Sequence, residues 1–159
     1  MMTIYLSLGS NLGDRRAMLQ EGERKLRQID GVTVKAVSAY YETPPWGKTD
    51  QPIFLNSAMA VETTLTPQEL LRHCQDIEKS LFRVRHEKWG ARTLDIDLVY
   101  SDDVMVYTKE LVLPHPYLLD RAFVLVPLAE IAPQLVLFQK PIQWWLSRLP
   151  EREQIVKSE

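Results

Sequence analysis

Hydrophobic residues recur at every second position in the first stretch of the chain, which is the period of a β-strand with one buried face. In residues 3–9, Ile4, Leu6 and Leu8 alternate with polar neighbours. Similar stretches bounded by turn residues predict further strands at residues 32–43, 54–63 and 94–100, with a short strand near 104–107. A β-sheet is therefore expected at the centre of the fold.

Two segments between these strands have the spacing of an amphipathic helix. The first is expected to run to about Asp30, where Gly31 would end it. The second covers residues 66–85 and begins with a capping box, in which Thr66 is the N-cap and Glu69 completes the pair. Both helices present an apolar stripe, so both are expected to pack against the sheet.

The order of these elements predicts the fold class. Two split β-α-β halves follow one another, before a hairpin, a helix after Leu119 and a short amphipathic turn in the C-terminal tail. This is the order of a ferredoxin-like α+β sandwich with a mainly antiparallel sheet. Helices would cover one face of the sheet, and the other face would be free for a site. No repeat or linker divides the chain, so one domain is expected over residues 1–159.

Composition and charge narrow the functional classes. The 159 residues have a formal net charge of −2 and are 45% hydrophobic and 25% charged, which is ordinary for a soluble globular domain. The chain offers no global basic field for nucleic acid or an anionic membrane, and no apolar stretch is long enough to span a bilayer. The single cysteine excludes an internal disulfide, and the N-terminus lacks a signal-peptide pattern, so a reducing cytoplasm is expected.

Two carboxylates interrupt an otherwise apolar strand. Asp95 and Asp97 lie two residues apart, so their side chains would point to the same face, about 6–7 Å apart along the strand. A divalent cation between them would remove their repulsion, and Mg²⁺ is usually held by one or two carboxylates together with substrate phosphates. We favour this metal site over the alternative, a solvated sheet face without function, because aspartate is a poor strand former.

Four basic residues precede this pair, namely Arg83, Arg85, Lys88 and Arg92. Guanidinium groups bind phosphate oxygens in a bidentate manner. For any single residue, a solvated helix end favoured by the helix dipole is an equally good explanation. As a group beside two carboxylates, they indicate binding and transfer of a polyphosphate.

A flat heterocycle is the ligand that several aromatic residues and an amide would suit. Trp46, Phe54 and Asn56 lie in and after a proline-rich loop, and Trp89 comes from elsewhere. Ordinary core aromatics and a turn asparagine explain these residues equally well on their own. The turn at residues 9–14 is only a weak match to a phosphate-binding loop, and a plain strand–helix turn is the preferred interpretation.

Taken together, these motifs resemble one enzyme family, the 6-hydroxymethyl-7,8-dihydropterin pyrophosphokinases (HPPK) of folate biosynthesis. Matching segments run in family order over nearly the whole chain: LSLGSNLGD, YYETPPWG, QPIFLNSA, QDIEKSLFRVRHEKWGARTLDIDLVY and LPHPYLLDRAFVLVPLAEIAP. The resemblance implies an ATP-dependent diphosphotransferase that moves the diphosphoryl group of ATP to the hydroxymethyl oxygen of the pterin and releases AMP. It also implies an α/β/α form of the ferredoxin-like sandwich.

The resemblance also assigns roles to residues of this chain. Two Mg²⁺ ions would bind the pair Asp95 and Asp97, and Arg83 and Arg92 would join that pair as catalytic residues. The ATP site is implied at Gln75, Glu78, Arg83, Arg85, Lys88, Trp89, Arg92, His115, Tyr117 and Arg121. The pterin site is implied at Thr43, Pro44, Trp46, Phe54, Asn56, Trp89 and Phe123. The expected partners are these two small molecules, without nucleic acid or membrane, and a monomer is the working expectation.

Two other functions stay open at this stage. A nucleotidyltransferase would also combine a Gly-Ser turn with an Asp-x-Asp pair, but there the two motifs lie close together in sequence, whereas Gly9 and Asp95 are far apart. A non-catalytic ferredoxin-like ligand-binding module would explain the fold and the aromatic residues, but it would not need two carboxylates beside several cations. The product separates the two enzymes, since a nucleotidyltransferase releases pyrophosphate and a pyrophosphokinase releases AMP.

Overall fold

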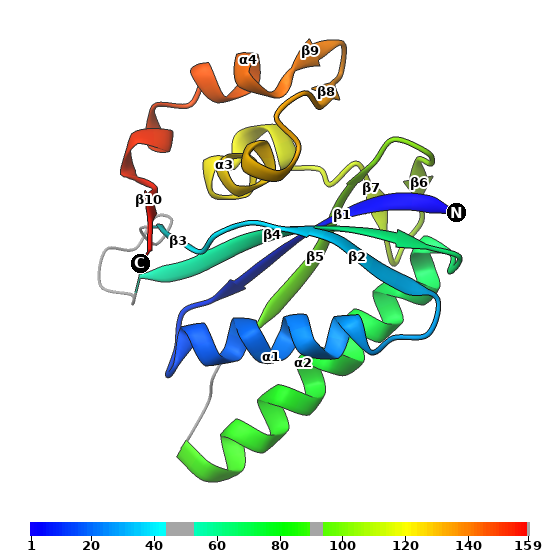
Figure 1. Ribbon diagram of the computed structural model, residues 1–159, viewed down its shortest axis with the longest axis vertical. Coiled ribbons are helices and arrows are strands. Elements are labelled where there is room, and N and C mark those ends of the chain that lie inside the picture. The colour runs from blue at the N-terminus through cyan, green and yellow to red at the C-terminus, as the bar shows by residue number, and fades with distance from the viewer. Residues whose placement is uncertain (44–52, 90–93, 159) are drawn as a thin grey trace.

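A six-stranded antiparallel sheet lies at the centre of the protein, in the order β10-β3-β4-β1-β5 with β2 also paired to β4 (Figure 1). The computed structural model describes residues 1–43, 53–89 and 94–158, and for residues 82–89 it describes the backbone alone. The strands of the sheet are β1 Met2–Ser10, β2 Val32–Val37, β3 Tyr41–Thr43, β4 Phe54–Thr63, β5 Asp95–Ser101 and β10 Val156–Lys157.

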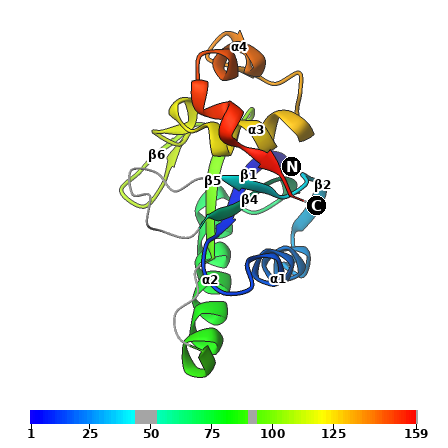
Figure 2. The same ribbon diagram turned by 90° about the vertical axis from the view of Figure 1, so that its left-hand side faces the viewer.

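Helices cover both faces of the sheet, so the protein has three layers (Figures 1 and 2). α1 (Arg15–Arg27) and α2 (Pro67–Trp89) lie on one face, and α3 (Ala122–Ile131) lies on the other, which confirms the expected α/β/α sandwich. None of the described helices is long and apolar enough to cross a bilayer. The remaining elements are β6 Val106–Tyr107, β7 Val112–Leu113, η1 Leu118–Asp120, β8 Val136–Leu137, β9 Lys140–Pro141, α4 Ile142–Ser147 and η2 Pro150–Gln154.

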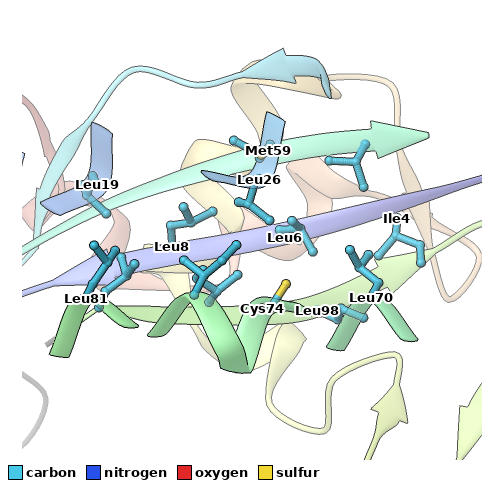
Figure 3. Close-up of a cluster of buried hydrophobic side chains, with 14 of the residues drawn as sticks. Ile4, Leu6, Leu8, Leu19, Leu26, Met59, Leu70, Cys74, Leu81 and Leu98 are labelled. Atoms are coloured by element: carbon cyan, nitrogen blue, oxygen red, sulfur yellow. The ribbon is translucent and has the colours of Figure 1, made fainter. Parts of the chain in front are cut away.

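Strand β1 separates two hydrophobic clusters. Ile4, Leu6 and Leu8 point toward α1 and α2 and form the first cluster with side chains of both helices (Figure 3). The second cluster lies on the opposite face of the sheet, where Leu125 and Leu128 of α3 are fully buried. The expectation that this face would be free is therefore wrong in part. An almost entirely apolar helix must be covered, and α3 achieves this by packing on the sheet.

The strand expected over residues 32–43 is divided into β2 and β3. Between them, the backbone N–H of Ala39 donates to the Glu130 carboxylate on α3 at 3.1 Å instead of to a neighbouring strand. The Ser38 hydroxyl donates to the Ala39 carbonyl and accepts from the N–H of Ala58. Because Glu130 lies 91 residues further along the chain than Ala39, local alternation does not reveal this break.

The ends of the two long helices also differ from the expectation. α1 ends at Arg27 rather than near Asp30, and α2 continues to Trp89, past its expected end. Gly31 does not end α1 directly. It adopts a φ of 86° and turns the chain into β2, while its carbonyl accepts from the N–H of Thr64.

Strand β5 contains a bulge at Val99. Tyr100 is paired with Tyr5 of β1, but Leu98 is paired with Leu6, so Val99 is the extra residue. In the strand predicted over residues 94–100, strict alternation would put Tyr100 on the same face as Leu98, and the bulge makes that expectation wrong. Tyr100 packs against the second cluster, and its ring stacks on that of Tyr5 with the centroids 6.3 Å apart.

The capping box predicted at the start of α2 is present. The Thr66 hydroxyl accepts from the N–H of Glu69 at 3.1 Å, and the Glu69 carboxylate accepts from the N–H of Thr66 at 2.8 Å. The bond from the Thr66 backbone is the main cause that lowers the pKa of Glu69. These bonds satisfy two N–H groups that the first turn of a helix leaves without partners, so they fix where α2 begins.

We expect Thr66→Ala to lower the free energy of unfolding by about 1 kcal/mol, because one N–H of the first turn loses its acceptor. Thr66→Ser keeps the hydroxyl and serves as the matched control, so it should retain most of the stability. Urea denaturation measures both variants. An alanine variant as stable as the wild type would show that the capping box contributes nothing.

Candidate active site

A cavity of about 200 Å³ lies between the sheet and the N-terminal end of α3. Strands β1, β3, β4 and β5 all contribute to its lining, which consists of Ser7, Gly9, Thr43, Phe54, Asn56, Asp95, Asp97, Arg121 and Phe123. All of these residues except Ser7 and Gly9 were expected at the site from the sequence. The fold therefore brings the proposed metal pair and part of the proposed pterin site to one place.

The pairing of three strands sets the floor of this cavity. Gly9 on β1 lies opposite Asn56 on β4 and opposite Asp95 on β5. Ser7, two residues earlier, lies opposite Asp97. Residues paired across antiparallel strands project to the same side of the sheet. The amide and the two carboxylates consequently share the face that opens to the cavity.

The Asn56 side chain is held in one orientation. Only 4% of the residue is exposed, and its Nδ2 donates to the hydroxyl of Thr43 at 2.7 Å. The amide oxygen therefore points the other way, toward Gly9, where an added Cβ would lie 2.5 Å from Oδ1. A glycine at this position is what leaves room for the amide.

Asp95 and Asp97 form a carboxylate pair that lines the cavity, where both residues keep contact with solvent but the Asp95 carboxyl is partly desolvated. Loss of solvation raises the pKa of Asp95, and the neighbouring charge of Asp97 raises it further. The described part of the chain holds no cluster of three or more His, Cys, Asp or Glu side chains that could form a metal cage. Two carboxylates alone fit Mg²⁺, which completes its ligand shell with waters and substrate phosphates.

Helix α2 supports the carboxylate pair from the side. The Glu78 carboxylate accepts from the N–H of Ile96 at 2.8 Å, and Ile96 is the residue between the two aspartates. β5 is an edge strand, so N–H groups on its outer side are open to side-chain acceptors. Burial raises the pKa of Glu78, although the bond from Ile96 opposes this shift. Gln75 lies about one turn earlier on α2 and is exposed.

The loop before α3 brings a histidine to the same place. The N–H of His115 donates to the carbonyl of Val99 at 2.9 Å, so the bulge in β5 anchors this loop. Nδ1 of His115 accepts from the N–H of Tyr117 at 3.1 Å. Burial lowers the pKa of His115; Asp97 opposes this shift, and Arg121 adds to it. The imidazole is therefore neutral near pH 7, with its hydrogen on Nε2.

Arg121 lies against two aromatic rings beside the cavity. Its guanidinium carbon is 5.1 Å from the ring centre of Tyr117 and 5.6 Å from that of Phe123. Such cation–π contacts restrict a long side chain and keep its charge available. The structure thus places a held cation near the carboxylate pair, as the binding of a polyphosphate would need.

Arg15, at the start of α1, joins the two strand ends that precede and follow residues 44–52. Its guanidinium donates to the carbonyl of Ile53 at 2.7 Å and lies 3.6 Å from the carboxylate of Glu42. Glu42 is followed by Thr43, and Ile53 is followed by Phe54, and both of these neighbours line the cavity. The bridge therefore positions two parts of the cavity wall.

The turn at residues 9–14 is the plain strand–helix turn that was preferred from the sequence. Gly9 and Ser10 belong to β1. Asp14 is the N-cap of α1, and its carboxylate accepts from the N–H of Ala17 at 3.0 Å. An anionic group already occupies the N-terminus of this helix, which disfavours a phosphate there.

Several expected site residues lie outside the part of the chain whose side chains the structure describes. These are Pro44, Trp46 and Arg92, together with Arg83, Arg85, Lys88 and Trp89 on the last turns of α2. Their roles stay predictions.

Ser7 and Gly9 were not expected to line the cavity. They are the small residues on the polar face of β1, and they alternate with Leu6 and Leu8. The alternation itself was visible in the sequence. Only the register of β1 against β4 and β5 shows that this face meets the aspartate pair.

The fold is that of a ferredoxin-like α/β/α protein with a cavity beside a carboxylate pair. A family model described as 7,8-dihydro-6-hydroxymethylpterin-pyrophosphokinase (HPPK) matches residues 5–133. The chain belongs to this family.

Known relatives agree with this assignment. A 2-amino-4-hydroxy-6-hydroxymethyldihydropteridine pyrophosphokinase of Methylorubrum extorquens is 50% identical over 149 residues, which cover 94% of each chain. The enzyme of the same name from Bacillus subtilis is 46% identical over 131 residues, 82% of this chain and 78% of its own. A solved Plasmodium falciparum HPPK-DHPS shares the fold with a TM-score of 0.77 at 14% identity, over 98% of this chain and 46% of that longer one. The expected family and the enzyme class, an ATP-dependent pyrophosphokinase of folate biosynthesis, are confirmed.

We expect Gly9→Ala to destabilise the protein by about 1–3 kcal/mol, because the added Cβ would displace the Asn56 amide from its bond with Thr43. The double variant Gly9→Ala/Asn56→Ala removes the clashing amide and should be more stable than the sum of the two single changes allows. Urea unfolding of the four proteins measures this coupling. Strictly additive losses would contradict the contact.

Asp95→Asn should raise the free energy of unfolding of the metal-free protein at neutral pH. The pKa of Asp95 is raised in the folded state, so its contribution to stability is lost as the pH rises through the folded pKa. Asparagine does not ionise, so the variant does not lose stability in this way. The difference in free energy of unfolding between variant and wild type should be largest at neutral pH and vanish below the ordinary aspartate pKa. Urea unfolding with a chelator between about pH 3 and 7 tests this, and an advantage that grows toward low pH would refute it.

Proposed function

We propose that this cavity is where the reaction of the family takes place, with the pterin at Thr43, Phe54, Asn56 and Phe123 and the ATP phosphates at Asp95 and Asp97. The reaction transfers the diphosphoryl group of ATP to the hydroxymethyl oxygen of 6-hydroxymethyl-7,8-dihydropterin and releases AMP. The register around Gly9 is the observation that supports this placement most. On one face of the sheet, a hydrogen-bonding amide lies on one side of Gly9 and the carboxylate pair lies on the other.

The described part of the proposed pterin site combines two aromatic side chains with one fixed amide. Phe54 and Phe123 line the cavity and suit the faces of a flat ring. With one Nδ2 hydrogen bound to Thr43, Asn56 keeps Oδ1 and the second Nδ2 hydrogen for a ligand. An adjacent acceptor and donor match the edge of a pterin, which carries both kinds of group. Pro44, Trp46 and Trp89 join this proposed site by family resemblance.

ATP is proposed to lie where α2, β5 and the loop before α3 meet. Arg121 supplies positive charge at the cavity, and the neutral His115 offers the hydrogen on Nε2 to a phosphate oxygen. Gln75, Glu78 and Tyr117 are the other described neighbours in this proposal. By resemblance, Arg85, Lys88 and Trp89 also bind ATP, and Arg83 and Arg92 neutralise charge on the transferred group.

We also propose that Asp95 and Asp97 hold two Mg²⁺ ions together with the phosphates of ATP. When bound, Mg²⁺ would neutralise phosphate charge and lower the pKa of the attacking hydroxyl. Asp95 and Asp97 would hold the charge of the bound ions on β5, on the other side of Gly9 from Asn56. Asn56 and Thr43 orient the ring so that its hydroxymethyl group faces the β-phosphorus, and positioning of this kind contributes much of the catalysis in phosphoryl transfer.

The separation of Gly9 and Asp95 in sequence is not an argument against the rival nucleotidyltransferase function. Gly9 and Asp95 are far apart in the chain, yet they are paired across β1 and β5. Membership of the pyrophosphokinase family is what disfavours this rival. The same membership disfavours a non-catalytic binding module.

We propose further that the enzyme is cytoplasmic, acts as a single domain over residues 1–159, and is a monomer whose partners are its two small-molecule substrates. The net charge of −2 supports the absence of a nucleic acid or anionic membrane partner. The single cysteine, Cys74, is buried and free, which agrees with a reducing compartment.

Product analysis tests the proposed reaction. Purified protein should release AMP when ATP, Mg²⁺ and 6-hydroxymethyl-7,8-dihydropterin are all present, and not when any one is omitted. Chromatography of the nucleotides measures this. Release of ADP or of free pyrophosphate would mean that the aspartate pair serves a different phosphate transfer.

Asp97→Ala should lower turnover by about 10²-fold or more while the protein stays folded, because the phosphates lose half of the proposed metal site. Asp102→Ala is the matched control, since this exposed carboxylate lies just beyond β5 and does not line the cavity, and it should keep the wild-type rate. Steady-state assays with circular dichroism as the folding check compare them. A normal rate for Asp97→Ala would remove the metal site from the proposal.

A further inference from the structure

The C-terminal segment lies beyond the region that the family model matches, which ends at residue 133. This segment forms β8, β9, α4 and η2 on the side of α3 and then returns to the sheet as β10 (Figures 1 and 2). There it pairs with β3, with Val156 opposite Glu42 and Lys157 opposite Tyr41. A segment remote in sequence thus lies beside the strand that carries Thr43.

We propose that β10 is a positioning element of the pterin site. It holds β3 in place, and through β3 it holds the hydrogen-bonded pair of Thr43 and Asn56 in the orientation that a ligand would meet. This inference rests on the proposed function, because it takes the cavity to be the pterin site.

The shortness of β3 is the first argument. The strand has only three residues, Tyr41–Thr43, and on its other side it pairs with β4. At its N-terminal end the chain has already left the sheet, because the N–H of Ala39 is bonded to Glu130. So short a strand would be marginal at the edge of a sheet, where water competes for each of its few hydrogen bonds. β10 makes β3 an internal strand.

Ser158, the residue after β10, is held by both its backbone and its side chain. The N–H of Ser158 donates to the carbonyl of Tyr40 at 2.7 Å, and the Ser158 hydroxyl accepts from Arg16 at 2.9 Å. The guanidinium carbon of Arg16 lies 5.0 Å from the ring centre of Tyr40, whose hydroxyl donates to Glu23 at 2.7 Å. The last described residue is therefore tied both to α1 and to the residue directly before β3.

The path from β10 to the cavity is short. Tyr41 is paired with Lys157 on one side and with Asn56 on the other. Thr43, two residues later, accepts the Asn56 amide, and both of these residues are buried. The carboxylates of β5 lie on the far side of β4 and β1. Loosening β3 should therefore weaken pterin binding and leave the nucleotide side unchanged.

Ser158→Pro removes the N–H that bonds to Tyr40, whereas Ser158→Ala, the matched control, removes only the hydroxyl that Arg16 contacts. Binding of 6-hydroxymethylpterin is measured by its fluorescence, with a saturating non-hydrolysable ATP analogue and Mg²⁺ present. We expect Ser158→Pro to raise the pterin dissociation constant about three- to tenfold, and Ser158→Ala to raise it less. The affinity for the ATP analogue should be unchanged in both.

Deletion of residues 156–159 is the second variant, and it should show a selective loss of pterin affinity at least as large. Unchanged pterin affinity in the deletion variant would overturn the inference. So would an equal loss of affinity for both ligands, because that result means general destabilisation. Wild-type protein that binds the ATP analogue but no pterin would overturn the proposed pterin site itself, which separates the two failures.

Discussion

The antiparallel pairing of β1 with β4 and β5 is the constraint on which both the core and the cavity depend. On one face of β1, Ile4, Leu6 and Leu8 are fully buried, and burial of such side chains contributes roughly 1.5–3 kcal/mol each. On the other face, Ser7 and Gly9 form the floor of the cavity. A slip of the pairing by one residue would move the apolar residues into the cavity and the small residues into the core. The energy of the core therefore enforces the register that assembles the site.

The aspartate pair is a local conflict that the surrounding structure sustains. Asp95 has a raised pKa because its carboxyl is partly desolvated beside Asp97, so the ionised pair opposes folding when nothing is bound. Ile96 and Leu98, on the other face of β5, are almost fully buried and anchor the strand, and Glu78 holds the Ile96 N–H. Such a conflict with local preference is characteristic of a functional site, since the ligand relieves what the empty protein must bear.

Features with a local cause could be predicted from the sequence, and features with a distant cause could not. The capping box at Thr66 and the full extent of β4 follow from neighbouring residues, and both are present as expected. The division between β2 and β3 depends on Glu130, which is distant in sequence. The face on which Tyr100 lies depends on the bulge at Val99. The local pattern of apolar and polar residues reveals neither. Phe54, Asn56 and the aspartate pair in the cavity lining were expected from their chemistry, whereas Thr43, Arg121 and Phe123 were expected only from the family resemblance. Gly9 has no distinctive chemistry, and its importance arises only from what lies on either side of it.

Arg15 makes the positions of the strand ends beside residues 44–52 independent of the number of residues in that segment. Its contacts with Glu42 and Ile53 belong to α1 and to the strand ends, so the points between which the segment must close are set without it. The entropic cost of joining two fixed points by a stretch of chain rises only slowly with the number of residues in the stretch. Insertions, deletions and exchanges in this segment are therefore compatible with the pairing of β3 and β4. In this enzyme, the sequence between β3 and β4 and the stability of the sheet can consequently evolve at different rates.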